Sequence, residues 1–485
     1  MTNPIPAENA NIGTTAWIPG SNLATTQIQA YCDQHAVDPG GTINLFVSTQ
    51  SAGTTWSGAI YRLGWYQGTG ARLIAAIPQQ SGVAQGYFDG TNLNNCPTAI
   101  VDTTTHLLEA GWSSSYRWQV PNNAVSGIYL AQCTDQNGKY TYCSFVVRGN
   151  RPADYAYIRP TTTDAAYNNW GGWSLYTVPG SGVKVSFNRP DWNGGGTGGL
   201  FQLEIQFIKW AERQGYNLSY LTMQDVHENG TWLQHYNAVL SAGHNEYWTK
   251  EIRAAFYAAR ESGVGLAFLG ANACYWQMRF ESDHAGNADR TVTCYKVQTS
   301  GGPALSNDPY YGVDNSRVTA LWRDPVLNQP EAALCGIMFS DLIYNGIKVP
   351  WQMAATPSQT YLGGTGLVAG QSYGADLIGF EYDKQFASSP ANLQIIAQSS
   401  PLNEYGNPDT QHTTTYVAPS GALVFASGSH AFTFALDQYR WSAAGTPYVV
   451  PGIQALMSNI MAALVQGKAA QTVQTAQSSL SSFHT

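Results

Sequence analysis

A histidine and a glutamate two residues apart follow a short apolar segment near the middle of the chain. Residues 238–242, AVLSA, predict a buried strand, and Gly243 then leads into His244 and Glu246. An imidazole and a carboxylate can bind a metal ion or transfer a proton. Their spacing fits no standard zinc motif such as HExxH, so a pair that only caps a loop is the alternative.

A second polar turn follows the apolar segment 264–269 and contains Asn272 and Cys274. A strand that leads into a glycine-flanked turn is typical of a nucleophile elbow, but Asn272 occupies the turn and Cys274 lies beyond it. Asn272 could hold a carbonyl or an oxyanion through its amide, or could be an ordinary turn residue. A hydrolase triad of Cys274, His244 and Glu246 would start from a misplaced nucleophile, so we expect Cys274→Ala to have little effect.

Three further side chains could take part in chemistry. Tyr167 lies in a loop rich in glycine and aromatic residues, and Tyr129 lies in a predicted hairpin. Each has a plain alternative as a packed aromatic residue. Glu381 stands in an apolar setting, where burial raises the pKa of a carboxyl and can make it a base. It could equally be an ordinary acid at the end of a strand.

The elements around His244 predict a strand–loop–helix–strand unit. Thr249 can cap a helix that Gly263 ends, and residues 264–269 predict the next buried strand. In open parallel sheets, ligands bind beyond the carboxyl ends of the strands. His244 and Glu246 stand at such an end, which makes them candidate site residues.

The chain predicts an all-β part followed by an α/β part. Residues 1–150 contain short alternating segments separated by turns, which favours an antiparallel β-sandwich of the immunoglobulin-like type. Residues 151–467 predict an α/β domain with a parallel sheet and β-rich additions, and 468–485 predict a flexible polar tail. Cys133 and Cys143 flank a predicted turn and could be free thiols or a disulfide.

The composition excludes several classes of function. Charged residues make up 11% of the chain, against roughly 25% in average proteins, and the net charge is −8. Without a basic cluster we expect no nucleic-acid partner. No apolar run reaches the ~18 residues of a membrane span, and the N-terminus is no secretory signal. The compartment is therefore cytoplasmic by default, and export by a non-classical route stays open.

Six sequence segments together resemble the large (β) subunit of N,N-dimethylformamidase and the family that shares its C-terminal domain. The resemblance runs in order from roughly residue 125 to residue 440. The segments are AAYNNWGGWSLY (165–176), FIKWAERQGYNLSYLTMQDVH (207–227), LSAGHNEYW (240–248), FLGANACYWQMRFE (268–281), DRTVTCYK (289–296) and IGFEYD (378–383).

The resemblance implies a mononuclear iron (Fe3+) site, hydrolysis of an amide, and an α/β domain similar to the class I glutamine amidotransferases. Phenolate and carboxylate are hard anionic ligands that suit ferric iron. The implied ligands are Tyr129, Tyr167 and Glu246. The implied catalytic residues are His244, Asn272 and Glu381.

The function expected from this resemblance is metal-dependent hydrolysis of the C–N bond of a small-molecule amide. The dimethylformamidase large subunit works with a small subunit, so a small partner subunit and a homo-oligomer are both open. The alternative is a non-catalytic binding or assembly protein, or an exported effector, on the same scaffold, which the low charge and the Gln/Ser-rich tail favour. The presence of all six residue types disfavours that alternative.

Overall fold

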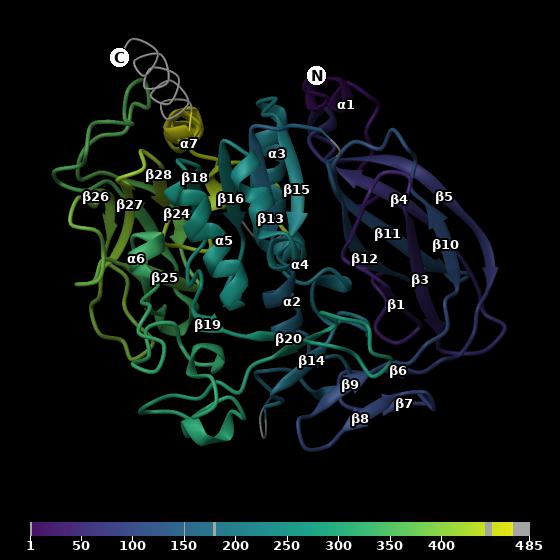
Figure 1. The fold of residues 1–485 in the computed structure, drawn as a ribbon. Coiled ribbons are helices and arrows are strands. Elements are labelled where there is room, and N and C mark those ends of the chain that lie inside the picture. Colours follow the sequence, from purple (N-terminus) through teal and green to yellow (C-terminus); the bar gives the residue numbers. More distant parts are fainter. Residues whose placement is uncertain (1, 150, 178–180, 442–448, 469–485) are drawn as a thin grey trace, which may run out of the picture.

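The computed structural model describes residues 2–149, 151–177, 181–441 and 449–468. The predicted flexible tail therefore lies outside the described residues, apart from its first residue, Lys468. The described chain is a mixed α/β protein with many antiparallel strands in several sheets (Figure 1).

Two mostly antiparallel sheets form the N-terminal part. Their strands are β1 (Ile28–Cys32), β2 (Ala36–Val37), β3 (Thr42–Thr49), β4 (Thr55–Leu63), β5 (Ala71–Ser81), β10 (Tyr116–Gln119), β11 (Gly127–Asp135) and β12 (Tyr140–Val147). One sheet has the order β1-β3-β10 and the other the order β2-β12-β11-β4-β5. Smaller elements flank them, namely α1 (Ile5–Asn9), β6 (Tyr87–Phe88), β7 (Leu93–Asn94), β8 (Ile100–Asp102) and β9 (Leu107–Glu109).

The alternation of side chains along β11 shows how this part packs. Tyr129 and Ala131 point into the core between the two sheets. Ile128 and Leu130 point the other way, into a core shared with the α/β part of the chain. Because successive residues of a strand face opposite sides, one strand contributes to both cores. The five-stranded sheet is therefore covered on both faces.

A seven-stranded sheet organises the rest of the chain. Its strands are β13 (Tyr155–Arg159), β15 (Leu218–Thr222), β16 (Ala238–Ala242), β18 (Gly265–Leu269), β26 (Gln394–Ser399), β27 (Gln411–Val417) and β28 (Leu423–Ala426). The order is β15-β13-β16-β18-β28-β27-β26. The first five are parallel, and β27 and β26 are added antiparallel at one edge.

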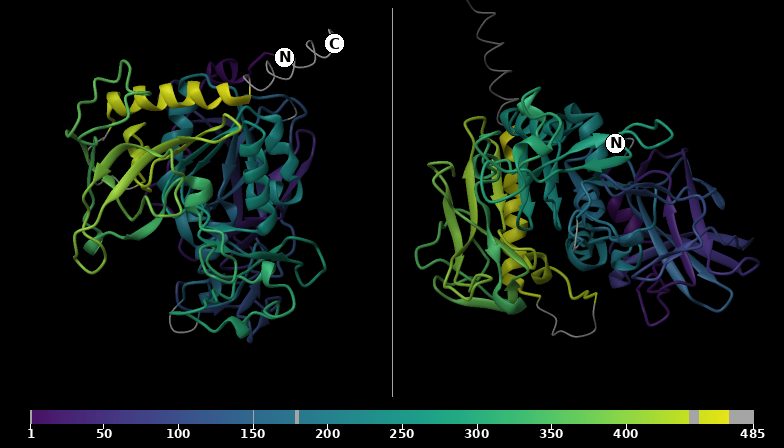
Figure 2. Two further views of the ribbon diagram at one scale, coloured as in Figure 1. Left: turned by 60° about the vertical axis from the view of Figure 1, so that its left-hand side comes forward. Right: turned by 90° about the horizontal axis from the view of Figure 1, so that it is seen from below.

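Helices cover both faces of this sheet. They are α2 (Thr161–Tyr167), α3 (Ile205–Arg213), α4 (Met223–Glu228), α5 (Lys250–Glu261), α6 (Ala332–Cys335) and α7 (Pro451–Leu464). Apolar residues of α3 and α7 share one core with the sheet, and those of α4 and α5 share the other. Figure 2 shows α7 in yellow as a long helix beside the sheet.

Short strands make up the β-rich additions. They are β14 (Lys184–Ser186), β17 (Tyr247–Trp248), β19 (Trp276–Gln277), β20 (Arg279–Glu281), β21 (Thr291–Thr293), β22 (Met338–Leu342), β23 (Val349–Gln352), β24 (Ser372–Ile378) and β25 (Glu381–Lys384). They form separate sheets of two or three strands, so they extend the molecule without widening the central sheet.

The predicted strand–loop–helix–strand unit is confirmed, with β16, α5 and β18 within a residue or two of the predicted bounds. Thr249 caps α5 as predicted, because its hydroxyl oxygen accepts the Ile252 N–H at 3.1 Å. A π-helical turn, Leu200–Glu204, stands directly before α3. Cys133 and Cys143 are free thiols, and each faces a different residue across the β11–β12 pair.

A buried ion pair joins the N-terminal part to the α/β part. The Arg62 guanidinium on β4 and the Glu212 carboxylate on α3 are 2.8 Å apart, and both side chains are fully buried.

Arg62→Met is expected to lower the free energy of unfolding by roughly 3 kcal/mol, because it leaves a buried carboxylate unpaired. Denaturant unfolding measures this loss. Arg117→Met, at an exposed position, is the control. Equal small losses of unfolding free energy in both variants would contradict a stabilising role for the buried ion pair.

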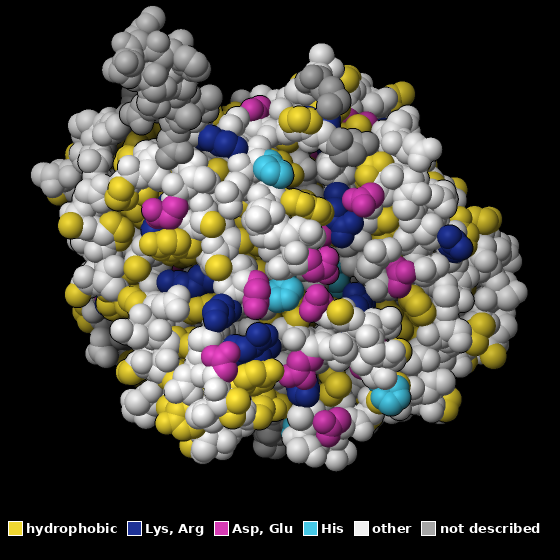
Figure 3. Space-filling view, in the orientation of Figure 1, with side chains coloured by type: hydrophobic (Ala, Val, Ile, Leu, Met, Phe, Trp, Pro, Cys, Tyr) yellow, Lys and Arg dark blue, Asp and Glu magenta, His cyan; other side chains and the backbone are white. Residues whose placement is uncertain are grey.

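The surface reflects the low charge of the sequence. On the face in Figure 3 most of the surface is white, and charged side chains are scattered, with histidine and both signs of charge near the middle. No helix among the described residues is long and apolar enough to cross a membrane.

Candidate active site

The loop after β16 holds His244 and Glu246 at the carboxyl edge of the parallel strands. Gly243 has a φ of +75°, a backbone conformation that residues other than glycine rarely adopt. This glycine turns the chain out of the strand. The backbone N–H of Glu246 donates to the Thr163 hydroxyl of α2 at 2.9 Å. The Glu246 side chain is 2% exposed, so the loop presents a carboxylate to the interior.

Two tyrosines converge on this carboxylate. Tyr167, the last residue of α2, donates its hydroxyl to Glu246 Oε2 at 2.9 Å, and Tyr176 donates to Oε1 at 2.7 Å. Their rings stack with centroids 4.2 Å apart. The Tyr247 hydroxyl lies 2.6 Å from that of Tyr176 and donates to it. Each oxygen of Glu246 therefore accepts a hydrogen bond from a phenol.

A lysine lies beside the same group. The Lys296 Nζ stands 3.2 Å from the centroid of the Tyr176 ring and donates to the Leu175 carbonyl at 2.9 Å. Burial lowers the pKa of Lys296 to about 8, while the Glu246 carboxylate acts in the opposite direction. The ammonium therefore provides positive charge close to Glu246.

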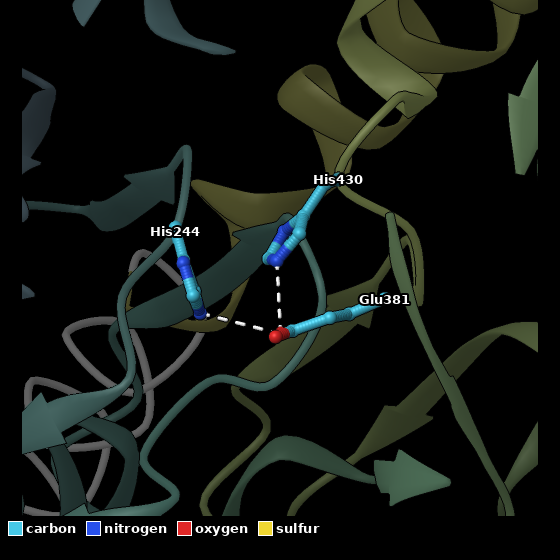
Figure 4. A group of neighbouring side chains, drawn as sticks. All are labelled: His244, Glu381 and His430. Carbon is cyan, nitrogen blue, oxygen red and sulfur yellow. Dashed lines mark hydrogen bonds and ion pairs between the residues drawn. The ribbon is translucent and has the colours of Figure 1, made fainter. Parts of the chain in front are cut away.

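Two histidines meet on the carboxylate of Glu381 (Figure 4). His244 Nε2 and His430 Nε2 lie 3.2 and 3.0 Å from the same oxygen, Glu381 Oε2. His244 Nε2 is also 3.3 Å from Glu246 Oε2. The ligand atoms of His244, Glu381 and His430 lie within 4.8 Å of one another, so this group could bind a metal ion.

The electrostatics around Tyr167, Tyr176 and Glu246 favour a bound cation. Burial, and then the Glu246 carboxylate, raise the pKa of Tyr167 and of Tyr176 far above the ordinary value, so both phenols are protonated as they stand. Burial raises the pKa of Glu246 as well, against the effect of His244. A cation that replaced the two phenolic protons would gain anionic oxygen ligands from residues already in contact, which fits a hard metal ion.

An unpaired buried atom points the same way. Asn272 Oδ1 is buried and makes no hydrogen bond within the described structure. His244 Nε2 contacts the Glu381 and Glu246 carboxylates as an ion pair. Burial acts to lower the pKa of His244, but the carboxylates of Glu381 and Glu246 raise it to about 9. A positive imidazole thus occupies the space between two carboxylates, where a metal cation could replace its charge.

The parallel strands bring the site residues together. His244, Asn272 and His430 follow β16, β18 and β28, which are neighbours in the sheet. The backbone N–H of Asn272 donates to Asp383 Oδ1 at 2.8 Å, which ties this turn to β25. Glu381 is the first residue of β25, so it reaches the carboxyl edge from outside the sheet.

The structure does not bring Tyr129 to this site. Its ring packs against Trp118 and Phe145 inside the core between the two N-terminal sheets, and its hydroxyl donates to the Val125 carbonyl at 2.9 Å. The prediction of Tyr129 as a ligand is therefore corrected, because its position on β11 faces that core. Tyr176 is the second tyrosine on Glu246.

Cys274 does not face His244. Its sulfur accepts a hydrogen bond from Arg253 at 3.2 Å, and burial raises the pKa of the thiol to about 12 although Arg253 acts to lower it. A buried protonated thiol is a poor nucleophile. The arrangement argues against the cysteine-hydrolase alternative.

Tyr129→Phe is expected to leave metal content and activity unchanged. Because the variant loses only the hydrogen bond to Val125, it should lower the free energy of unfolding by about 1 kcal/mol. Metal analysis and thermal unfolding of the purified variant check both parts. Loss of metal from this variant would restore Tyr129 as a ligand.

Sequence reasoning missed Tyr176 and His430, although both carry a signal. Tyr176 ends the aromatic loop that contains Tyr167. His430 follows the apolar strand β28 after Ser427-Gly428-Ser429, much as His244 follows β16 after Gly243. The rule that selected His244, a polar residue just beyond a buried strand, would also have selected His430.

A family model matches most of the chain. Residues 57–445 match a family described as N,N-dimethylformamidase beta subunit-like, C-terminal. No curated protein sequence matches the chain.

Matches to solved structures are partial. They include an alkylpurine DNA glycosylase of Pseudomonas fluorescens bound to DNA with an abasic site analog, at 10% identity and TM-score 0.16 over 26% of this chain and 31% of that one. A sporulation control protein of Bacillus subtilis matches at 7% identity and TM-score 0.16, over 26% and 49%. A cycloisomaltooligosaccharide glucanotransferase of Paenibacillus sp. matches at 13% identity and TM-score 0.16, over 55% and 33%. The chain spans less than half the length of each, and the likenesses carry no argument.

Proposed function

Because the chain belongs to the N,N-dimethylformamidase beta subunit-like family, we propose that it is a metal-dependent hydrolase of the C–N bond of small amides. The observation that carries this proposal is the convergence of Tyr167 and Tyr176 on the buried carboxylate of Glu246, next to two histidines and a second glutamate. Hard anionic ligands and acid–base groups at one sheet edge are what metal-assisted hydrolysis requires.

The metal in this proposal is a single ferric iron held by Tyr167, Tyr176 and Glu246. Phenolate and carboxylate oxygens suit Fe3+, and three protein ligands leave coordination positions open. When bound, the ion would supply Lewis acidity toward the amide carbonyl and toward water. Lys296, beside the Tyr176 ring, partly balances the negative charge of these ligands.

The remaining residues would bind the amide and move protons. Burial acts to raise the pKa of Glu381, as its apolar setting suggested, but the contacts with His244 and His430 hold it well below the ordinary value, so the carboxylate is ionised. The low pKa makes it a weak base as it stands, and in this proposal it accepts the proton of water in the transition state. His244, protonated next to it, can donate a proton to the leaving amine. Asn272 can hold the carbonyl oxygen through its amide nitrogen. Water adds to the carbonyl carbon, the C–N bond breaks, and the products are a carboxylate and an amine.

The group of His244, Glu381 and His430 is the alternative place for a metal. Imidazole nitrogens and one carboxylate would suit zinc as well as iron. The two placements of the metal predict different visible spectra. Tyrosinate bound to ferric iron has an absorption band in the visible range, and a metal held by imidazole and a carboxylate lacks that band. Replacing Tyr176 with Phe would abolish or weaken the band only in the first placement.

The architecture proposed with this function is an immunoglobulin-like sandwich over 1–150 and a class I glutamine amidotransferase-like α/β domain over 151–467. The face-to-face packing of the two N-terminal sheets and the five parallel strands of the central sheet support this division. A small partner subunit and self-association of the chain belong to the same proposal, because the family is that of a β subunit.

The test of the proposed activity is a panel of small amides. The purified, iron-loaded chain is incubated with formamides and acetamides, and the released amine and carboxylate are quantified. Equal release of both products, absent in Glu246→Gln, supports the proposal. No release from any amide by a chain that holds its metal would favour a binding protein on the same scaffold.

A further inference from the structure

His430 is bonded through both ring nitrogens, and one of its partners can only donate. The backbone N–H of Ala271, in the turn after β18, points at His430 Nδ1 with an N–N distance of 3.2 Å. The other nitrogen, Nε2, lies 3.0 Å from Glu381 Oε2. The side chain is 3% exposed, so water does not compete for either position.

The backbone amide decides where the proton of the ring lies. Because an N–H cannot accept, Nδ1 must carry the lone pair, and the single proton of the neutral ring is on Nε2. A doubly protonated ring would set Nδ1–H against the Ala271 N–H. The Nε2–H is therefore a donor to Glu381, and Nε2 has no lone pair to offer a metal in this arrangement.

We propose that His430 is a positioning residue that holds the Glu381 carboxylate toward His244, and that it is not a metal ligand. This inference rests on the proposed function, in which Glu381 receives the proton of water. Glu381 Oε2 lies between the two histidine rings, 3.2 Å from His244 and 3.0 Å from His430. With one contact fixed by His430, the carboxylate keeps its orientation whether His244 holds or has given up its proton.

Ser429 fixes the backbone segments of Glu381 and His430 relative to each other. Its hydroxyl donates to the Leu377 carbonyl at 2.8 Å and accepts the Gly379 N–H at 3.1 Å, just before Glu381. Tyr382 and Ser429 also form an isolated β-bridge. The segment that carries Glu381 is thus tied to the residue next to His430, so the contact between the two side chains rests on backbone that is fixed on both sides.

Two substitutions separate positioning from metal binding. In His430→Gln the side-chain amide nitrogen lies near the place of Nε2, so it can donate to Glu381, but it is a weak metal ligand. His430→Leu keeps a similar volume and removes the donor. Loss of such a supporting hydrogen bond typically costs 10- to 100-fold in activity.

The expected result is that both variants keep the metal content and visible band of the wild type. His430→Leu should lower kcat about 10- to 100-fold with KM within about twofold, and His430→Gln should stay within about fivefold of the wild type. Loss of metal from both variants would show that His430 is a ligand and would overturn the inference. Equal loss of kcat in both, with metal retained, would also overturn it, because the donor would then be irrelevant.

A second measurement does not depend on activity or metal. In protein labelled with 15N-histidine, long-range proton–nitrogen correlation spectra distinguish a ring protonated at Nε2 from one protonated at Nδ1. In the metal-free chain, the histidine signal that disappears in His430→Gln belongs to His430. This signal should be that of a ring with its proton on Nε2. A proton on Nδ1 or a doubly protonated ring at neutral pH would overturn the inference, even if amide hydrolysis itself were never observed.

Discussion

Glu246→Gln is expected to remove the bound metal and to slow amide hydrolysis by at least about 1,000-fold. A Lewis-acid cation stabilises the transition state by several kcal/mol, and each 1.36 kcal/mol is a factor of ten in rate. The substitution also removes the anionic acceptor of both phenols, Tyr167 and Tyr176. Metal analysis and the rate of amine release measure the two effects.

The matched control is Glu251→Gln on α5, whose side chain is 42% exposed. It changes the charge by the same amount at the surface, and it should leave metal and rate unchanged. If Glu246→Gln kept its metal and most of its activity, Glu246 would not be a ligand. The group of His244, Glu381 and His430 would then be the metal site to test next.

Glu381→Gln is expected to lower kcat about 100- to 10,000-fold while the metal stays bound. A positioned base contributes this much to a reaction that transfers a proton in the transition state. The amide of Gln can accept a hydrogen bond from His430 but cannot take a proton from water. Steady-state kinetics with the best amide of the panel, together with metal analysis, measure the effect.

The control for this variant is Glu404→Gln, at an exposed position, which should behave as the wild type. A kcat for Glu381→Gln within about fivefold of the wild type would remove Glu381 as the base. Loss of the metal together with activity would instead make Glu381 a ligand.

The parts of the site that the sequence predicted are those that local patterns determine. His244 and Glu246 follow an apolar segment and a glycine, and a polar residue at that place in a parallel sheet lies at the ligand-binding edge. The structure has them there, after β16. The unit β16–α5–β18 was predictable for the same reason, since a capped amphipathic helix between two apolar strands is a strong local signal.

The failure with Tyr129 has a simple physical reason. Residues along a strand alternate between its two faces, so an assignment from a short motif depends on which face each position takes. Tyr129 faces the core inside the sandwich, while its neighbours Ile128 and Leu130 face the α/β part. No local pattern in the sequence distinguishes these faces, because both are apolar.

The grouping of Glu381 and His430 with His244 could not be predicted from spacing. These residues are separated by long stretches of chain, and Glu381 enters from β25, which is outside the central sheet. Only the closure of the additions onto the sheet edge brings the two histidines onto one carboxylate. The short sheets between β19 and β25 have weak patterns, so their packing was not predictable either.

Metal analysis of the purified chain beside its visible spectrum tests the central claim most directly. About one iron per chain is expected, with a tyrosinate band that Tyr167→Phe and Tyr176→Phe each weaken and Tyr129→Phe leaves intact. No metal and no visible band, even after anaerobic loading with iron, would contradict the claim that this chain is an iron-dependent amide hydrolase.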